Sequence, residues 1–342
     1  MNPRPILFVL GSLLVALAAG MMIPALVDAF VGNADWQVFV VSGATTLFMG
    51  MTLMLANSAR GQGLTTREAF LMTVLIWIVL PLFSALPFMF STLELTFTDA
   101  YFEAVSGMTT TGSTVISGLD DLSEGLLLWR GILQWLGGLG IVIVALIFLP
   151  VMRVGGMQFF QSEGFDTLGK AMPRVMDLSS GLLNIYVGLT AILAMLYVLL
   201  GMNTFEAFVH AMTTMSTGGF STTDDSFAAF SPGAQYVGAL FMVLASVPFV
   251  RLFQFVVGQP KPLFQDRQVR AYLVWLAYAT FLVAAHRMWQ AGEVSEEVFR
   301  NSLFNVVSVF SGTGYGDCDR LAWGPFPFMW VFLVGGSGGW TG

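Results

Sequence analysis

The sequence predicts an all-α polytopic membrane protein, and two properties carry this prediction. Of its 342 residues, 56% are hydrophobic and only 10% are charged, whereas soluble domains carry roughly 25% charged residues. The apolar residues also form continuous runs of about 20, the length that crosses a bilayer as a helix. Such runs exclude a membrane β-barrel, whose strands show weak alternation instead. The single cysteine, Cys318, excludes a disulfide framework and a cysteine zinc site.

Eight membrane spans are predicted from these runs. They cover residues 5–29, 36–57, 69–91, 126–150, 180–201, 234–257, 271–290 and 325–341. The first span is not a cleavable signal peptide, because its leading segment carries only Arg4 and its apolar run is too long.

The basic residues indicate that the N-terminus is cytoplasmic. In this orientation ten of the 14 Lys and Arg residues lie inside, as the positive-inside rule requires. The ten are Arg4, Arg60, Arg67, Arg153, Lys170, Arg174, Arg251, Lys261, Arg267 and Arg270. The outer face then holds 16 of the 21 acidic residues, an excess that attracts cations. The positive-inside bias alone can also leave acids outside, so charge by itself does not assign a function.

Three outer loops repeat one pattern, a short apolar segment followed by a Thr/Gly cluster. The short segments run from Phe97 to Met108, Asn203 to Met215 and Glu296 to Ser311. Each is too short to span, which predicts a half-helix that enters the membrane and turns back. Acidic residues near the starts of these segments suit a helix N-terminus: Asp99, Glu103 and Glu206.

The clusters align on Thr111-Gly112, Thr217-Gly218 and Thr313-Gly314, which defines an internal repeat of about 100 residues. The repeat divides the chain into four segments. Residues 1–60 form two extra helices, 61–155 a first pore unit, 156–260 a second, and 261–342 an incomplete third.

The Thr/Gly clusters suit a dehydrated cation. Rings of backbone carbonyls replace the water around an ion in selective pores, and glycine permits the backbone conformations that this needs. The candidate ligands for an alkali cation are Thr110, Thr111, Gly112, Ser216, Thr217, Gly218, Gly312, Thr313 and Gly314. About four loops enclose one ion. Since this chain has three and ends within an apolar run, we expect it to be C-terminally truncated, with a fourth unit missing.

These residues resemble the Trk/Ktr/HKT superfamily of potassium transporters, and the bacterial TrkH-type subunit most closely. The resemblance covers essentially the whole chain. It rests on the segments Thr110–Thr114, Arg130, Gln134–Gly140, Val154–Gln158, Ser216–Thr222 and Gly312–Gly316.

The resemblance implies helix–half-helix–helix units around one pore, with Gly112, Gly218 and Gly314 lining its filter. Sodium-preferring plant relatives carry Ser at the first of these positions, so Gly112 favours potassium. The resemblance also implies a homodimer in the bacterial inner membrane and a cytosolic, nucleotide-binding regulatory subunit of the TrkA type. It implies a flexible gate as well, formed here by Gly335, Gly336, Ser337, Gly338 and Gly339. Small residues at these positions disfavour a regular helix, although tight helix packing is the alternative explanation.

The predicted function is potassium uptake, with no enzymatic activity, organic cofactor or nucleic-acid partner. Passive transport and transport coupled to H⁺ or Na⁺, as in a symporter, are both compatible with the sequence. The alternatives are a less selective K⁺/Na⁺ transporter, a nonfunctional fragment, a tetrameric potassium channel and a membrane enzyme. A tetrameric channel needs one filter per chain, and a membrane enzyme needs ionisable residues clustered within its spans. For Arg130, pairing with an outer carboxylate and a snorkelling anchor are equally expected.

Overall fold

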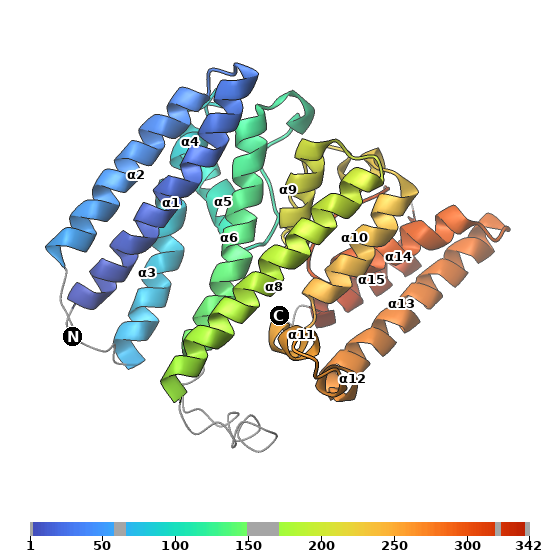
Figure 1. The fold of residues 1–342 in the computed structure, drawn as a ribbon. Helices are drawn as coiled ribbons and strands as arrows, with labels where there is room; N and C mark the ends of the chain where they lie inside the picture. Colours follow the sequence, from blue (N-terminus) through green and yellow to red (C-terminus); the bar gives the residue numbers. More distant parts are fainter. Residues whose placement is uncertain (1–2, 58–65, 149–170, 319–322, 339–342) are drawn as a thin grey trace. The chain divides into compact units, whose positions relative to one another are not determined.

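The computed structural model describes residues 3–57, 66–148, 171–318 and 323–338. The regular secondary structure of these residues is entirely helical (Figure 1). Within these residues, five stretches are long and apolar enough to cross a membrane: Arg4–Val31, Trp36–Ala56, Arg67–Phe90, Ser180–Leu199 and Arg267–Ala291. These correspond to five of the eight predicted spans. The described residues therefore confirm the all-α class.

The chain divides into two compact units. The first comprises Met1–Thr109, Leu122–Leu133 and Leu139–Ser180, and the second comprises Thr110–Asp121, Gln134–Gly138 and Gly181–Gly342. All three Thr/Gly clusters belong to the second unit. The division into four segments made from the sequence repeat stays a prediction.

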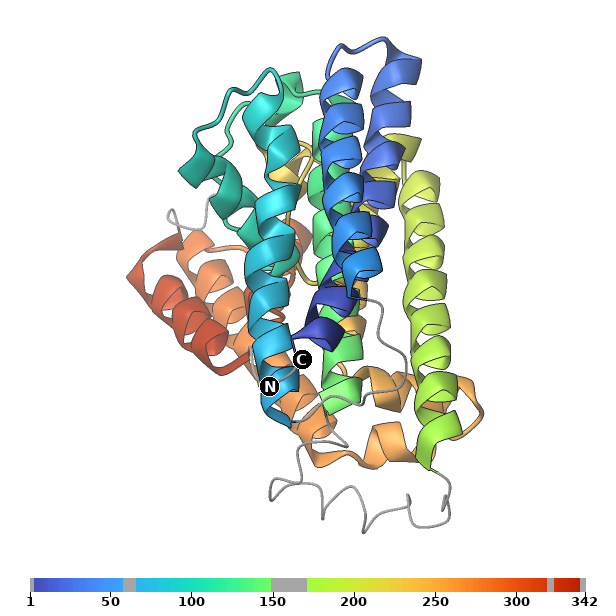
Figure 2. The same cartoon turned by 90° about the vertical axis from the view of Figure 1, so that its left-hand side faces the viewer.

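In the first unit, α1 (Arg4–Val31) and α2 (Trp36–Ala56) form the predicted N-terminal hairpin and run side by side (Figures 1 and 2). Two glycines set how closely they approach. A Cβ added to Gly11 would lie 2.7 Å from the carbonyl oxygen of Gly50, and one on Gly50 would lie 2.9 Å from that of Gly11. Small residues at a crossing let two membrane helices pack backbone to backbone.

The rest of the first unit joins this hairpin to the first short helix. The remaining elements are α3 (Thr66–Ser84), α4 (Leu86–Phe90), α5 (Phe97–Met108) and α6 (Glu124–Phe148), except that Gln134–Gly138 of α6 belongs to the second unit. Helix α3 packs against both α1 and α5. The Asp28 carboxylate accepts a 2.7 Å hydrogen bond from the backbone N–H of Gly125, and the Trp129 indole donates to the Ser84 carbonyl at 3.0 Å. The first turns of α6 are thereby fixed to α1 and α3.

The second unit contains α8 from Gly181 onward, a helix that runs Ala171–Leu199, and two further helix–half-helix arrangements. Its other helices are α9 (Thr204–Met215), α10 (Pro232–Ala245), α11 (Phe249–Val256), α12 (Lys261–Gln265), α13 (Arg267–Ala291), α14 (Glu296–Phe310) and α15 (Pro325–Gly338). Helix α9 packs on α10, and α14 packs on α10, α13 and α15.

The sixth predicted span, 234–257, is wrong as a continuous helix. Helix α10 ends at Ala245, and α11 leaves it at an angle of 100°. The cause is Pro248, which has no N–H to donate and pushes the preceding residue out of the helical region. Arg251, an expected cytoplasmic residue, lies in α11 and pairs with Asp266 at 2.9 Å.

Candidate functional site

Three short helices end at the three Thr/Gly clusters. Helices α5 and α9 have 12 residues and α14 has 15. At about 1.5 Å per residue they reach roughly 18–23 Å, less than the ~30 Å of a hydrocarbon core. Their limits match the short segments expected from the sequence to within one residue, so three half-helices are confirmed. Each helix directs its partially negative C-terminal end at a cluster, which favours a cation there.

The backbone of the three clusters follows one repeated path. In each, the second and fourth residues after the helix have positive φ. The values are 56° and 79° at Thr110 and Gly112, 50° and 81° at Thr217 and Gly219, and 80° and 88° at Gly312 and Gly314. A threonine in this left-handed region is strained by roughly 1–2 kcal/mol, and such strain concentrates at functional sites.

This torsion pattern corrects the sequence alignment of the second cluster. Gly219, rather than Gly218, has the conformation of Gly112 and Gly314. In the same register Gly312 corresponds to Thr110 and Thr217, and not to Ser216 as the sequence alignment implied. The two adjacent glycines of the second cluster caused the error, since Thr-Gly alone cannot distinguish them.

The three clusters approach one another through their backbones. A Cβ added to Gly112 would overlap the carbonyl oxygen of Gly218 and lie 3.6 Å from that of Thr313. One added to Gly219 would overlap the carbonyl oxygen of Thr313. The structure therefore brings backbone carbonyls of the second and third clusters against glycines of the first and second. Carbonyl oxygens are the ligands that selective potassium pores use.

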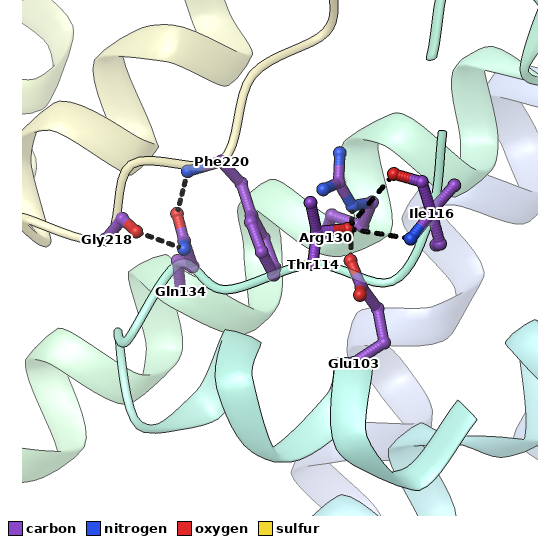
Figure 3. A network of polar contacts seen from close by, with 7 residues as sticks. All are labelled: Glu103, Thr114, Ile116, Arg130, Gln134, Gly218 and Phe220. Atoms are coloured by element: carbon purple, nitrogen blue, oxygen red, sulfur yellow. Dashed lines mark hydrogen bonds and ion pairs between the residues drawn. The ribbon is translucent and has the colours of Figure 1, made fainter. Parts of the chain in front are cut away.

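The second cluster is held by a glutamine to which the sequence assigns no role. The Gln134 amide donates to the Gly218 carbonyl at 2.7 Å and accepts from the Phe220 N–H at 3.0 Å (Figure 3). Its side chain is fully buried, so both of its polar ends depend on these contacts. A lone glutamine within an apolar span was the available signal.

The third cluster is held by its tyrosine and by its own helix. The buried Tyr315 hydroxyl hydrogen-bonds the Thr213 hydroxyl on α9, and its ring lies 4.5 Å from that of Phe227. The Tyr315 carbonyl accepts from the Ser308 hydroxyl at 2.8 Å. Burial also raises the pKa of the following Asp317 carboxyl. The third cluster therefore depends on contacts with two pore helices.

The remaining groups near the third cluster do not form a metal centre. Burial, and then the charge of Asp317, raise the pKa of Cys318 to about 12, which keeps the thiol protonated at neutral pH. No group of three or more His, Cys, Asp or Glu side chains that could hold a metal ion occurs among the described residues. The oxygen ligands of the clusters remain the candidate cation site.

Arg130 forms a buried ion pair. Its Nε lies 2.9 Å from a Glu103 carboxylate oxygen, and the two side chains are 1% and 0% exposed (Figure 3). The snorkelling explanation is therefore wrong, and pairing with a carboxylate is confirmed. The sequence suggested that Glu103 acts at the N-terminus of α5. It lies past the first turn of that helix, so this expectation is wrong.

The predicted break in the last helix is absent from the described part of the gate segment. Gly335, Gly336, Ser337 and Gly338 continue α15 as regular helix, and Gly339 lies outside the described residues. A Cβ on Gly335 would lie 2.8 Å from a Val309 methyl carbon on α14. Close helix packing, the alternative explanation, therefore accounts for Gly335, because packing overrides the low helix propensity of glycine.

Comparisons with known proteins agree on one family. Residues 35–316 match the model of the TrkH family, described as cation transport proteins. The potassium uptake protein TrkI of Halomonas elongata is 39% identical over 98% of this chain and 69% of its own length. TrkH of Escherichia coli is 34% identical over 100% of this chain and 73% of its own. The crystal structure of the potassium transporter TrkH from Vibrio parahaemolyticus aligns with a TM-score of 0.89 at 31% identity, over 98% of this chain and 70% of that one. The chain belongs to the TrkH family of cation transport proteins.

Proposed function

We propose that this chain builds the pathway through which a Trk-type system takes up potassium. The observation that carries the proposal is the threefold repeat of half-helix and positive-φ loop, with loop backbones that meet through carbonyl oxygens. Relatives that share 31–39% of its residues are named potassium uptake proteins or a potassium transporter. It is a transport protein of the membrane and not an enzyme.

The ion ligands in this proposal come from the backbone and hydroxyl oxygens of the three clusters. They comprise Thr110, Thr111, Gly112, Ser216, Thr217, Gly218, Gly312, Thr313 and Gly314, and the repeated torsions add Gly219. The ion loses its water as it enters, and the loop oxygens together with the C-terminal ends of the half-helices replace that solvation. The segment 335–339 is proposed as the gate.

We also propose in which membrane the chain lies and with which proteins it assembles. The chain lies in the bacterial inner membrane with its N-terminus in the cytoplasm, pairs as a homodimer and meets a cytosolic nucleotide-binding subunit. The inward excess of basic residues supports the orientation. Cysteine labelling from each side of right-side-out vesicles, at Asn33 and Gln259, checks the orientation: only Asn33 should react from outside.

A flux measurement distinguishes selective uptake from the less selective alternative. The native protein that contains this chain is reconstituted in vesicles, and initial Rb⁺ and Na⁺ uptake are compared. We expect a clear preference for Rb⁺. Equal rates would contradict potassium selectivity, and a folded protein that moves neither ion with its regulatory subunit present would contradict transport.

The variant Gly112→Ser sharpens the same measurement. Its Cβ would overlap the Gly218 carbonyl oxygen, at a φ of 79° that serine rarely adopts. The loop must shift, so we expect Rb⁺ uptake to fall and the ratio of Rb⁺ to Na⁺ to drop by about tenfold. An unchanged ratio would show that Gly112 does not form part of the filter.

A further inference from the structure

One position recurs in all three half-helices. Glu103 precedes Met108, His210 precedes Met215 and Asn305 precedes Phe310, in each case by five residues, and the second residue named ends its helix. The three side chains are chemically different, yet all are polar and all are 0% exposed. Buried polar side chains require partners. Each of these three has one that follows the positive-φ glycine of its own Thr/Gly cluster, which we call its filter loop.

The first of these contacts is ionic. Glu103 accepts from Arg130 at 2.9 Å, and the two residues stand 27 positions apart. The first cluster lies between them in the chain. The ion pair therefore links the half-helix that enters the cluster to α6, the helix that follows it.

The second contact is neutral. The His210 Nδ1 lies 2.9 Å from the Glu206 carbonyl oxygen, which can only accept, so Nδ1 carries the proton. In the neutral ring Nε2 then accepts from the Ser221 hydroxyl at 3.1 Å. The rings of Phe227 and Phe230 enclose the imidazole, with centroids at 5.4 and 4.8 Å. Ser221 follows Gly219 by two residues, so this contact also brackets its cluster.

The third contact joins an amide to a carboxylate. The Asn305 amide donates to an Asp317 carboxylate oxygen across 12 positions. The amide of Asn301, one turn earlier on α14, donates to the other carboxylate oxygen at 3.2 Å when its nitrogen faces Asp317. Asp317 follows Gly314 by three residues. The third cluster is thus closed in the same way as the other two.

We infer that Glu103, His210 and Asn305 are equivalent positioning residues, each of which closes the chain around its own filter loop. The inference rests on the proposed filter function of those loops. Selection among ions of one charge depends on ligands held to within about 0.5 Å. A loop that is held only where it leaves the half-helix can relax around a smaller ion. A loop that is held at both ends keeps its oxygens apart. Losing the contact then lowers selectivity more than it lowers transport.

The third contact gives the sharpest test, because its two groups can be exchanged. In the native protein, Asn305→Leu removes the donor at similar volume and should lower the ratio of Rb⁺ to Na⁺ uptake by about tenfold, the size expected for one charge-assisted hydrogen bond. The double variant Asn305→Asp with Asp317→Asn places the carboxylate on the helix and the amide on the loop. It restores the bond and should return the ratio to within about twofold of wild type.

A control variant and a second pair of variants keep the test decisive. Glu297→Gln, an exposed position on the same helix, is the matched control and should leave the ratio unchanged. If Asn305→Leu does not fold, His210→Gln and His210→Leu repeat the comparison in the second loop. The glutamine oxygen can accept from Ser221 and should keep the ratio, whereas leucine should lower it.

An unchanged ratio in a folded Asn305→Leu protein would overturn the inference, and so would failure of the exchanged pair to restore it. A folded His210→Leu protein with the wild-type ratio would do the same. Absence of Rb⁺ preference in the wild-type protein is a different result, since it would contradict the proposed function instead.

Discussion

The second and third filter loops follow the same backbone path but are held in different ways. The second places a threonine, Thr217, in the left-handed region and is gripped from α6 by Gln134. The third has Gly312 at the equivalent position and is held by Tyr315 and Ser308. The comparison shows that the path itself is what the two loops share. The second loop carries the backbone strain of a threonine at this place, whereas the third has a glycine, which adopts the same conformation without that strain.

The largest expected effect separates the two adjacent glycines of the second loop. Gly219→Ala adds a Cβ at a φ of 81° that would overlap the backbone carbonyl of Thr313, which cannot move without shifting its loop. Gly218→Ala instead meets the side-chain amide of Gln134, which can shift without moving the backbone but weakens the Gln134 clamp when it does. We expect Rb⁺ uptake to fall at least tenfold more in Gly219→Ala than in Gly218→Ala.

The measurement is initial Rb⁺ uptake by both variants at equal amounts of folded protein. Equal losses would contradict the correspondence of Gly219 with Gly112 and Gly314 that the torsion angles define. A greater loss in Gly218→Ala would restore the alignment that the sequence alone suggested.

The clamp on the second loop gives the next largest effect. Gln134→Leu leaves a buried carbonyl at Gly218 and a buried N–H at Phe220 without their present partner. Each such group costs about 1–3 kcal/mol, so we expect the free energy of unfolding to fall by about 3 kcal/mol and selectivity to be lost. Thermal unfolding in detergent and the ratio of Rb⁺ to Na⁺ uptake check both effects. Gln134→Glu, which retains the acceptor for Phe220, should be less affected; equal behaviour would show that only the volume of the side chain matters.

The smallest effect comes from exchanging the residues at the left-handed position. Thr217→Gly removes strain and should raise the free energy of unfolding by about 1 kcal/mol, whereas Gly312→Thr should lower it by about 1–2 kcal/mol. Thermal unfolding of the two variants measures the difference. Opposite signs would confirm that the loops differ in strain. Destabilisation by both would show that the Thr217 side chain contributes more than its backbone costs.

The sequence predicts the helices of this site better than its contacts. The half-helices α5, α9 and α14 were predictable because each short apolar segment ends at a Thr-Gly pair. The register of the second loop was not, since Gly218 and Gly219 differ in torsion angle and not in chemistry. Gln134 bonds Gly218 and Phe220, which follow it in the sequence by 84 and 86 positions. No local sequence pattern indicates a contact between residues so far apart in the chain.

Two predictions about where a helix is broken differ from the structure. The sequence predicts a continuous span at 234–257 and a break at 335–339. In the structure the first is broken, and α15 continues as helix through Gly338, where the described residues end. Local propensity decides the first, because Pro248 removes a backbone donor. Packing decides the second, since the absent side chain of Gly335 lets α15 lie close to Val309. A single sequence does not say which of these effects prevails.

The proposed function requires that the three loops bind one ion through their backbone oxygens. Anomalous diffraction from crystals of the native protein grown in Rb⁺ locates that ion. We predict a peak within coordination distance of oxygens from the loops at Gly112, Gly219 and Gly314, weakened when Na⁺ replaces Rb⁺. A peak elsewhere in the molecule, with none among these loops, would show that the loops do not bind the ion.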